Sequence, residues 1–224
     1  MIVGEGLIAT GFENSKEDYS NYVIFASGVS NSKETSDNEY NREKNLILKT
    51  IEENKDLKII YFSSILVDTT KNKYFENKLE VENIIKENSN NYIIFRIPQI
   101  VGKNGNPKNL VNHIKNSILN EDEITIHSNV ERSLLDIDDL VSIVDYCKDK
   151  TNCETLKISG IEKIKVFTLC ELIGNLVNKK PRLKIVDDIE YDNWSVENSK
   201  LINDAIIKIE PINYNYNILK KYII

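Results

Sequence analysis

Glycine, proline, cysteine and histidine are scarce in this sequence, whose 224 residues include eight Gly, four Pro, three Cys and two His. Cys147, Cys153 and Cys170 have no CxxC spacing, so neither a zinc site nor a disulfide framework is expected, and we predict reduced, buried thiols. His113 and His127 lie far apart without an HExxH spacing, which argues against a metal centre. A GxSxG elbow that could supply the nucleophile of a hydrolase is absent as well.

Long hydrophobic runs and an excess of positive charge are also missing. The apolar runs fall far short of the roughly 20 residues that a membrane span needs. The N-terminus, MIVGEGL, lacks the basic region of a signal peptide, so we expect a cytoplasmic protein without a membrane partner. The 29 Lys and Arg against 35 Asp and Glu give a net charge of −6, which argues against a nucleic-acid partner.

Continuous apolar runs alternate with segments of helical periodicity. Strands that are apolar throughout and alternate with helices predict an α/β fold, with a parallel sheet covered on both faces and ligands at the carboxyl ends of its strands. The predicted strands are 1–3, 22–26, 58–62, 92–97, 123–127, 154–158 and 183–187, and the predicted helices are 39–54, 73–88, 107–119, 136–148 (opening at Asp136 or Asp138), 167–179 and two stretches after 195 that are broken by Pro211.

Three of the eight glycines fall within the first eleven residues. Gly4-x-Gly6-x-x-Ala9 matches a dinucleotide-binding turn, in which the first Gly permits the turn and the second lets a pyrophosphate approach the backbone. The small third residue lets a helix pack closely on the strand, with the phosphates at the helix N-terminus. The alternative is a strand–helix turn that binds no ligand.

Tyr74-x-x-x-Lys78 places a phenol and an ammonium on one face of a predicted helix. A nearby ammonium stabilises a phenolate, so we expect Lys78 to lower the pKa of Tyr74 from its usual value near 10. Tyr74 could then exchange a proton with a carbonyl or alcohol oxygen. Ser64 ends a strand ten residues earlier and could hydrogen-bond the same oxygen. The alternatives are a solvated Tyr/Lys helix face and a serine that caps a turn.

Taken in order, these features resemble the extended short-chain dehydrogenase/reductase family, the NAD-dependent epimerases, dehydratases and reductases of nucleotide sugars. The segment KIIYFSSILV is similar to the family's strand with the catalytic Ser/Thr, and YFENKLEVENII to its YxxxK helix. The segments YIIFRIPQIVG, ERSLLDIDDLVSIV and ENSKLIND…IEP resemble three later family segments. The resemblance covers almost the whole chain.

The resemblance implies a Rossmann-like fold and assigns a role to each matching position. Ser64, Tyr74 and Lys78 are the expected catalytic residues, and Lys78 is also expected to hold the nicotinamide ribose. For the cofactor, NAD or NADP, the implied residues are Gly4, Gly6, Leu7, Ile8, Ala26, Ser27, Gly28, Lys78 and Pro98, and for the substrate they are Ser64, Gln99 and Arg132.

The chain has only four Arg and is otherwise rich in Lys. The planar guanidinium of arginine can donate two parallel hydrogen bonds to a phosphate. Arg132 matches the family arginine that binds the diphosphate of a nucleotide sugar, with a surface salt bridge as the alternative. Arg96, in a buried strand, is expected to be structural and to pair with a carboxylate such as Asp136 or Asp138.

The N-terminal half is shorter than the family pattern. About a dozen residues separate the glycine turn from the strand at 22–26, where the family has a full helix and two more strands. An acidic or basic residue that reads the adenosine ribose is expected about 20 residues after the turn, but that position falls within YVIFASG. Glu17 and Asp18 are the available substitutes. Cofactor binding is therefore expected to be weakened, and Gly11 is interpreted as the point of shortening.

The expected function is an NAD(P)-dependent reductase or epimerase of a nucleotide-linked keto sugar, in surface polysaccharide biosynthesis. The alternative is a non-catalytic, shortened Rossmann domain that binds a nucleotide or a partner protein. We expect a truncated dinucleotide-binding domain at 1–101 with 133–150, and a substrate lobe at 102–132 and 151–224. A homodimer through the helices at 39–54 and 73–88 is possible, with Leu46, Leu48 and Ile85 as apolar contacts.

Overall fold

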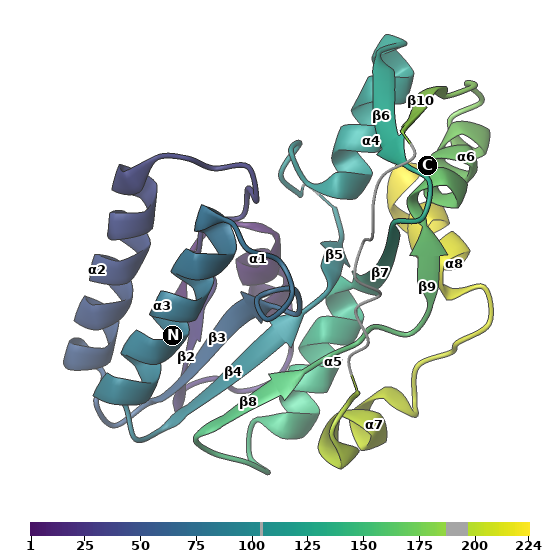
Figure 1. Ribbon diagram of the computed structural model, residues 1–224. Coiled ribbons are helices and arrows are strands. Elements are labelled where there is room, and N and C mark those ends of the chain that lie inside the picture. The colour runs from purple at the N-terminus through teal and green to yellow at the C-terminus, as the bar shows by residue number, and fades with distance from the viewer. Residues whose placement is uncertain (104, 187–196) are drawn as a thin grey trace.

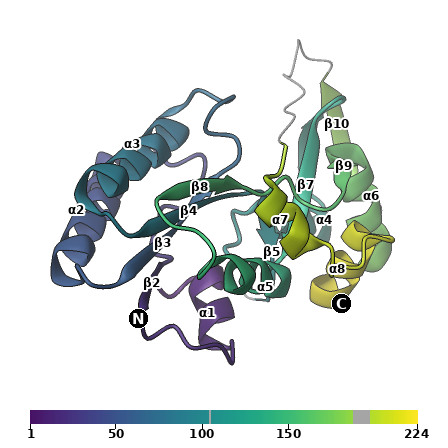
Figure 2. The ribbon, with the colours of Figure 1, turned by 90° about the horizontal axis from the view of Figure 1, so that it is seen from below.

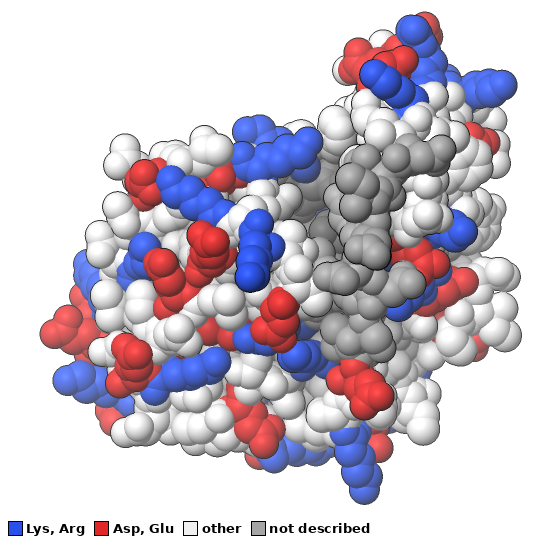
Figure 3. Space-filling model, in the orientation of Figure 1, with Lys and Arg blue, Asp and Glu red and all other residues white. Residues whose placement is uncertain are grey.

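The computed structural model describes residues 1–103, 105–186 and 197–224. A parallel five-stranded sheet with helices on both faces forms one side of the molecule, and a smaller α/β lobe forms the other (Figure 1). The predicted fold class is therefore confirmed. Figure 3 shows Lys and Arg interspersed with Asp and Glu over the face that carries α2 and α3.

The large sheet has the strand order β1-β2-β3-β4-β8, and every neighbouring pair is parallel. Helices α2 and α3 cover one face, and α1 and α5 cover the other, as Figure 2 shows. The elements are β1 (Ile2–Val3), α1 (Leu7–Glu13), β2 (Tyr22–Phe25), α2 (Asp37–Glu53), β3 (Lys58–Ser64), α3 (Lys73–Asn88), β4 (Tyr92–Ile97), α5 (Ile137–Cys147) and β8 (Glu154–Lys157).

Successive side chains of the central strands enter two separate cores, because side chains alternate between the faces of a strand. In β2, Val23 and Phe25 pack with Ile47 of α2 and Val81 of α3. Ile24, between them, joins the larger core under α1 and α5. This double burial explains why the strands are apolar throughout.

The connection from β1 to β2 has an unusual hand. The first four strands lie side by side in chain order, and α2 and α3 cross on one face, whereas α1 crosses on the other. The β1–α1–β2 connection is therefore opposite in hand to the two that follow. Since such crossovers are right-handed in about 98% of proteins, β1–α1–β2 is the left-handed exception. Phe12 anchors α1 there by ring contacts with Tyr19 and Phe62.

The smaller lobe combines two short sheets with four helices. β5 and β7 pair in parallel and β7 and β9 pair antiparallel, while β6 and β10 form a separate parallel pair. Its elements are β5 (Gln99–Val101), α4 (Leu110–Asn120), β6 (Glu123–His127), β7 (Glu131–Asp136), β9 (Lys163–Lys165), α6 (Val166–Leu176), β10 (Arg182–Val186), α7 (Lys200–Ile206) and α8 (Tyr214–Ile223).

The predicted helix at 73–88 and the predicted strands at 92–97 and 123–127 have the predicted bounds. Asp136 and Asp138 were the two predicted starting residues of α5. In the structure the N-cap is Asp136, whose carboxylate accepts a hydrogen bond from the Asp138 amide at 3.0 Å. The short strands β5, β7 and β9 were not predicted. The domain boundaries stay a prediction.

Three expectations about single residues are wrong. Cys153 is exposed, whereas Cys147 and Cys170 are buried as predicted. Gly11 lies inside α1, two residues before the helix ends, where an added Cβ would come within 2.6 Å of Ile137, and its interpretation as the point of shortening stays a prediction. Ile85 is fully buried and offers nothing to a dimer contact.

The third concerns the partners of Arg96, which are carboxylates as predicted but are not the suggested Asp136 and Asp138. Its guanidinium instead donates to both oxygens of Glu82, at 2.8 and 2.7 Å, and to Asp68 at 2.7 Å. Within the described ranges, no helix is long and apolar enough to cross a membrane, and no cluster of His, Cys, Asp and Glu is suited to a metal ion.

Candidate active site

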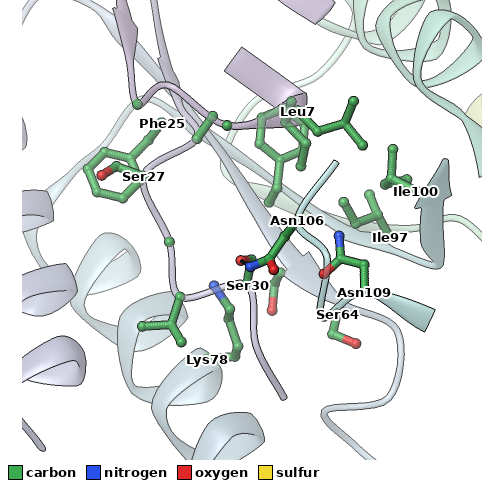
Figure 4. A pocket seen from close by; sticks show the side chains of 18 of the residues that line it. Leu7, Phe25, Ser27, Ser30, Ser64, Lys78, Ile97, Ile100, Asn106 and Asn109 are labelled. Atoms are coloured by element: carbon green, nitrogen blue, oxygen red, sulfur yellow. Dashed lines mark hydrogen bonds between the residues drawn. The ribbon is translucent and has the colours of Figure 1, made fainter. Parts of the chain in front are cut away.

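A cavity of about 930 Å³ opens at the carboxyl ends of β1, β2, β3 and β4, where the parallel sheet predicted a ligand site. Every residue that the sequence predicted for catalysis, cofactor or substrate lines it, from Gly4 and Gly6 on one side to Gln99 and Arg132 on the other. The structure thus brings the predicted residues together, and their individual roles stay predictions. Figure 4 shows Lys78 reaching from α3 toward the loop that carries Ser27 and Ser30.

The glycine turn forms one wall of the cavity. Gly4 has a φ of +127°, and an added Cβ would lie 2.6 Å from the carbonyl oxygen of Ala26. Gly6 caps α1 with an extended backbone, and an added Cβ there would meet nothing within 4 Å. The first glycine is therefore required by the fold, whereas the second keeps a space in the cavity open.

This difference predicts different outcomes for two matched substitutions. Gly4→Ala is expected to destabilise the protein by about 1–3 kcal/mol, because it combines a left-handed φ with a backbone clash. Gly6→Ala is expected to cost less, about 0.5–1 kcal/mol, since the position is open and only the N-cap preference for Gly over Ala is lost. Thermal unfolding of the two variants checks this, and equal losses would contradict it.

Helix α3 presents Tyr74 and Lys78 to the cavity because of where it begins. The side chain of Asn72 caps the helix by accepting a hydrogen bond from the Phe75 amide at 3.0 Å. Tyr74 then lies in the first turn and Lys78 one turn later, with the ammonium 5.7 Å from the centre of the Tyr74 ring. Ser64 ends β3, and its hydroxyl accepts a hydrogen bond from the Leu66 amide at 3.2 Å. That bond leaves the hydroxyl proton of Ser64 for a ligand.

The ammonium of Lys78 has a partner that the sequence analysis missed. It donates to the carboxylate of Glu43 at 2.9 Å and to the hydroxyl of Tyr61 at 3.2 Å. Both side chains of this ion pair are buried, with 4% of Lys78 and none of Glu43 exposed. The positive charge at this wall is thus already paired inside the protein.

The expected lowering of the Tyr74 pKa is wrong. Burial raises the pKa of this phenol, Lys78 lowers it and Glu43 raises it again, so the pKa lies above its usual value. The predicted influence of Lys78 exists but does not outweigh burial. In this state Tyr74 is a neutral phenol at physiological pH, a group that donates a proton rather than accepts one.

The opposite wall comes from the smaller lobe. Arg132 lies on β7, lines the cavity and donates to the carbonyl of Glu131 at 2.8 Å. Asn106 and Asn109 line the same wall, and the amide of Asn106 donates to the Ser30 hydroxyl at 2.9 Å, which links the two lobes across the cavity. Neither asparagine carries a signal in the sequence, because the loop before α4 meets the cavity only in the folded chain.

The proposed substitutes for the adenosine reader lie elsewhere. Asp18 accepts hydrogen bonds from Ser20, and Glu17 pairs with Lys148 at 3.4 Å, and neither lines the cavity. Arg42 does line it, at the end near β1. Its guanidinium donates to the hydroxyl and carbonyl oxygens of Ser27, at 3.3 Å each. A positive group therefore stands next to the part of the chain that packs on the glycine turn, and it comes from α2.

Neither the sequence search against protein-family models nor the search of curated proteins found a match. Solved structures do match. A dTDP-glucose 4,6-dehydratase from Bacillus anthracis str. Ames, in complex with NAD, has a TM-score of 0.70 at 16% identity over 91% of this chain and 71% of that chain. The chain shares the fold of this enzyme.

Two further structures support this fold. A UDP-glucose 4-epimerase from Thermus thermophilus, in complex with NAD, has a TM-score of 0.69 at 8% identity, over 91% of this chain and 77% of that chain. A UDP-N-acetylglucosamine 4-epimerase from Methanobrevibacter ruminantium, in complex with UDP-N-acetylmuramic acid, has a TM-score of 0.68 at 13% identity, over 91% of this chain and 75% of that chain.

The strand order locates the shortening within this fold. The Rossmann order 3-2-1-4-5-6 becomes 1-4-5-6 when strands 2 and 3 are removed, which is the order of β1, β2, β3 and β4 here. This loss explains the left-handed β1–α1–β2 connection. Helix α1 stays on the same face of the sheet, but the chain now passes from it directly to the strand that lies on the opposite side of β1 from the missing strands. This structure is therefore a Rossmann-like fold without strands 2 and 3.

Proposed function

We propose that this protein is an NAD(P)-dependent reductase or epimerase of a nucleotide-linked keto sugar, in surface polysaccharide biosynthesis. The observation that carries the proposal is the convergence of Ser64, Tyr74 and Lys78 on one cavity with the turn of Gly4 and Gly6. The solved structures of the same fold, several of them bound to NAD or to a UDP-sugar, support this interpretation.

The cavity suits the nicotinamide side of a dinucleotide. The open space at Gly6 leaves room for a phosphate against the backbone. The Ser63 hydroxyl, buried and lining the cavity, has no hydrogen-bond partner within the described residues, so a ligand could supply one. Lys78 and Pro98 would flank the nicotinamide and its ribose. When bound, the cofactor supplies or accepts the hydride.

The protein's own groups would handle the proton. Tyr74 is neutral and would donate its proton to the carbonyl oxygen of the keto sugar, as that oxygen becomes an alcohol. Ser64 would hold the same oxygen through its free hydroxyl proton. Arg132 and Gln99, on the side of the smaller lobe, would bind the diphosphate and the sugar.

Titration of NADH and NADPH, followed by cofactor fluorescence, tests the proposal. We expect saturable binding at micromolar concentrations, and we expect Gly6→Ala to weaken it at least about tenfold, because a Cβ would fill the phosphate space. That variant should stay folded, with a thermal stability only slightly below that of the wild type, so lost binding would not reflect lost fold.

The missing strands favour a second candidate, a non-catalytic domain that binds a nucleotide or a partner protein. Adenosine contacts contribute burial and hydrogen bonds of about a kcal/mol or more each. Their loss lowers affinity by about tenfold for every 1.4 kcal/mol. Absence of binding at millimolar cofactor would support this second candidate and reject the first.

A further inference from the structure

Glu43 is a fully buried acid that reaches the cavity wall from α2. One oxygen accepts hydrogen bonds from the Tyr61 hydroxyl at 2.8 Å and the Lys78 ammonium at 2.9 Å. The other accepts from the Val29 amide at 3.0 Å and the Asn77 side chain at 3.1 Å. All of its usual acceptor positions are therefore filled, by groups from β3, α3 and the loop after β2.

The ion pair lies directly against the loop that follows β2. A Cβ added to Gly28 would come within 2.6 Å of the Lys78 nitrogen and 2.8 Å of a Glu43 oxygen. The glycine there lets the loop rest on the ion pair, and Glu43 binds the next residue of the loop through the Val29 amide. Two of the three Lys78 donors are used, which leaves one N–H for a ligand in the cavity.

The charge state of Lys78 depends on Glu43. Burial lowers the pKa of this lysine, but Glu43, with smaller contributions from Tyr74 and Glu82, opposes burial, and together they hold the pKa above its usual value. The other titratable groups that face Lys78 are Tyr61 of β3 and Tyr74 and Glu82 of α3. The pKa of each tyrosine is raised, so both are neutral, and Glu82 is bound by Arg96.

We propose that Glu43 is a positioning residue of the site, one that keeps Lys78 charged and seated beneath Gly28, beside Tyr74. The proposal rests on the proposed function for its catalytic meaning. It predicts that the site loses its cation at alkaline pH once Glu43 is neutralised. A solvated glutamate on a helix surface would have no such effect.

The direct test is an NMR titration of 13C-labelled lysine side chains in the protein without cofactor. In the wild type the Lys78 signal should stay protonated beyond pH 10. In Glu43→Gln it should titrate at least about one pH unit below an ordinary lysine, because burial is no longer opposed. Glu43→Asp keeps the negative charge on a shorter side chain, so in this variant Lys78 should titrate at a pH between those of the wild type and Glu43→Gln. The Asp variant therefore tests the role of Glu43 even if the Gln variant does not fold.

Glu80→Gln is the matched control. Glu80 and Lys44 form a Glu–Lys pair between the same two helices, but in solvent, with 59% of the Glu80 side chain exposed. Its loss should leave the Lys78 titration unchanged. An unshifted Lys78 titration in both Glu43 variants, or an equal shift in Glu80→Gln, would overturn the proposal.

NADH affinity measured against pH links the residue to the function. In Glu43→Gln, the affinity for NADH should fall by about tenfold per pH unit once the pH exceeds the lowered pKa of Lys78. The affinity should recover at pH 6. A purely structural role of Glu43 would lower affinity equally at every pH, and that result would overturn the proposal. If the wild type binds no NADH, the proposed function fails, while the lysine titration still decides the role of Glu43.

Discussion

Under the proposed function, Tyr74→Phe is expected to lower turnover of a nucleotide-linked keto sugar by about 10²–10⁴-fold while leaving the fold intact. The phenol lines the cavity above Lys78, and no hydrogen bond holds its hydroxyl within the described part of the chain. Its removal therefore deletes a proton donor without breaking a native contact. The raised pKa of Tyr74 keeps that proton on the oxygen at neutral pH, which suits the direction of carbonyl reduction.

The measurement is the rate of NADH oxidation with a panel of UDP- and dTDP-linked keto sugars, at equal cofactor saturation. Tyr216→Phe is the control, because Tyr216 is an exposed tyrosine on α8 and does not line the cavity. Thermal unfolding should be the same for both variants and the wild type. Unchanged turnover in Tyr74→Phe would show that another group moves the proton.

The sheet and its helices could be predicted because their signals are local. Strands buried on both faces are apolar at nearly every position, as in β4, where all six residues are buried and only Arg96 is charged. Helix α3 has a cap, an apolar stripe and a length that agree with one another. β5 and β9 are three residues long and only partly buried, so their pairing with β7 depends on the folded chain and leaves no periodicity to detect.

The site could be predicted only in part, for a related reason. Gly4, Gly6, Tyr74 and Lys78 stand in patterns whose chemistry is recognisable from their spacing. Arg42, Asn106 and Asn109 reach the cavity through the arrangement of α2 and of the loop before α4, which no local pattern specifies. The net pKa of Tyr74 was mispredicted because burial, which outweighs Lys78, is a property of the whole fold.

Glu43 did carry a signal in the sequence. Tyr40, Glu43, Ile47 and Ile51 lie three or four residues apart, and all four are buried on one stripe of α2. A charged residue on the apolar stripe of a helix needs a buried partner, since an unpaired buried charge is unfavourable. The sequence therefore indicates that Glu43 has a cationic partner, and only the structure identifies it as Lys78.

A second buried ion pair, between Arg96 and Glu82, predicts a large effect on stability. Arg96 of β4 binds both oxygens of Glu82, which is fully buried on α3 one turn after Lys78. Arg96→Met would leave that carboxylate with Lys86 as its remaining cation, at 3.4 Å. We expect a loss of about 3–5 kcal/mol, because breaking a buried pair strands a charge in the core. The melting temperature should fall by roughly 10 °C for a chain of this size.

The double variant Arg96→Met/Glu82→Met separates the stranded charge from lost packing. Replacing both members of a buried pair by apolar side chains is often neutral, so we expect most of the stability to return. Asp68, the other partner of Arg96, keeps Lys157 at 2.7 Å and stays solvated. Arg182→Met, at an exposed arginine on β10, should change stability by no more than about 0.5 kcal/mol. If the double variant were as unstable as Arg96→Met, the loss would come from the packing geometry of the Arg96–Glu82 pair and not from the stranded charge. Helix α3 would then depend on that packing to hold Tyr74 and Lys78 at the cavity.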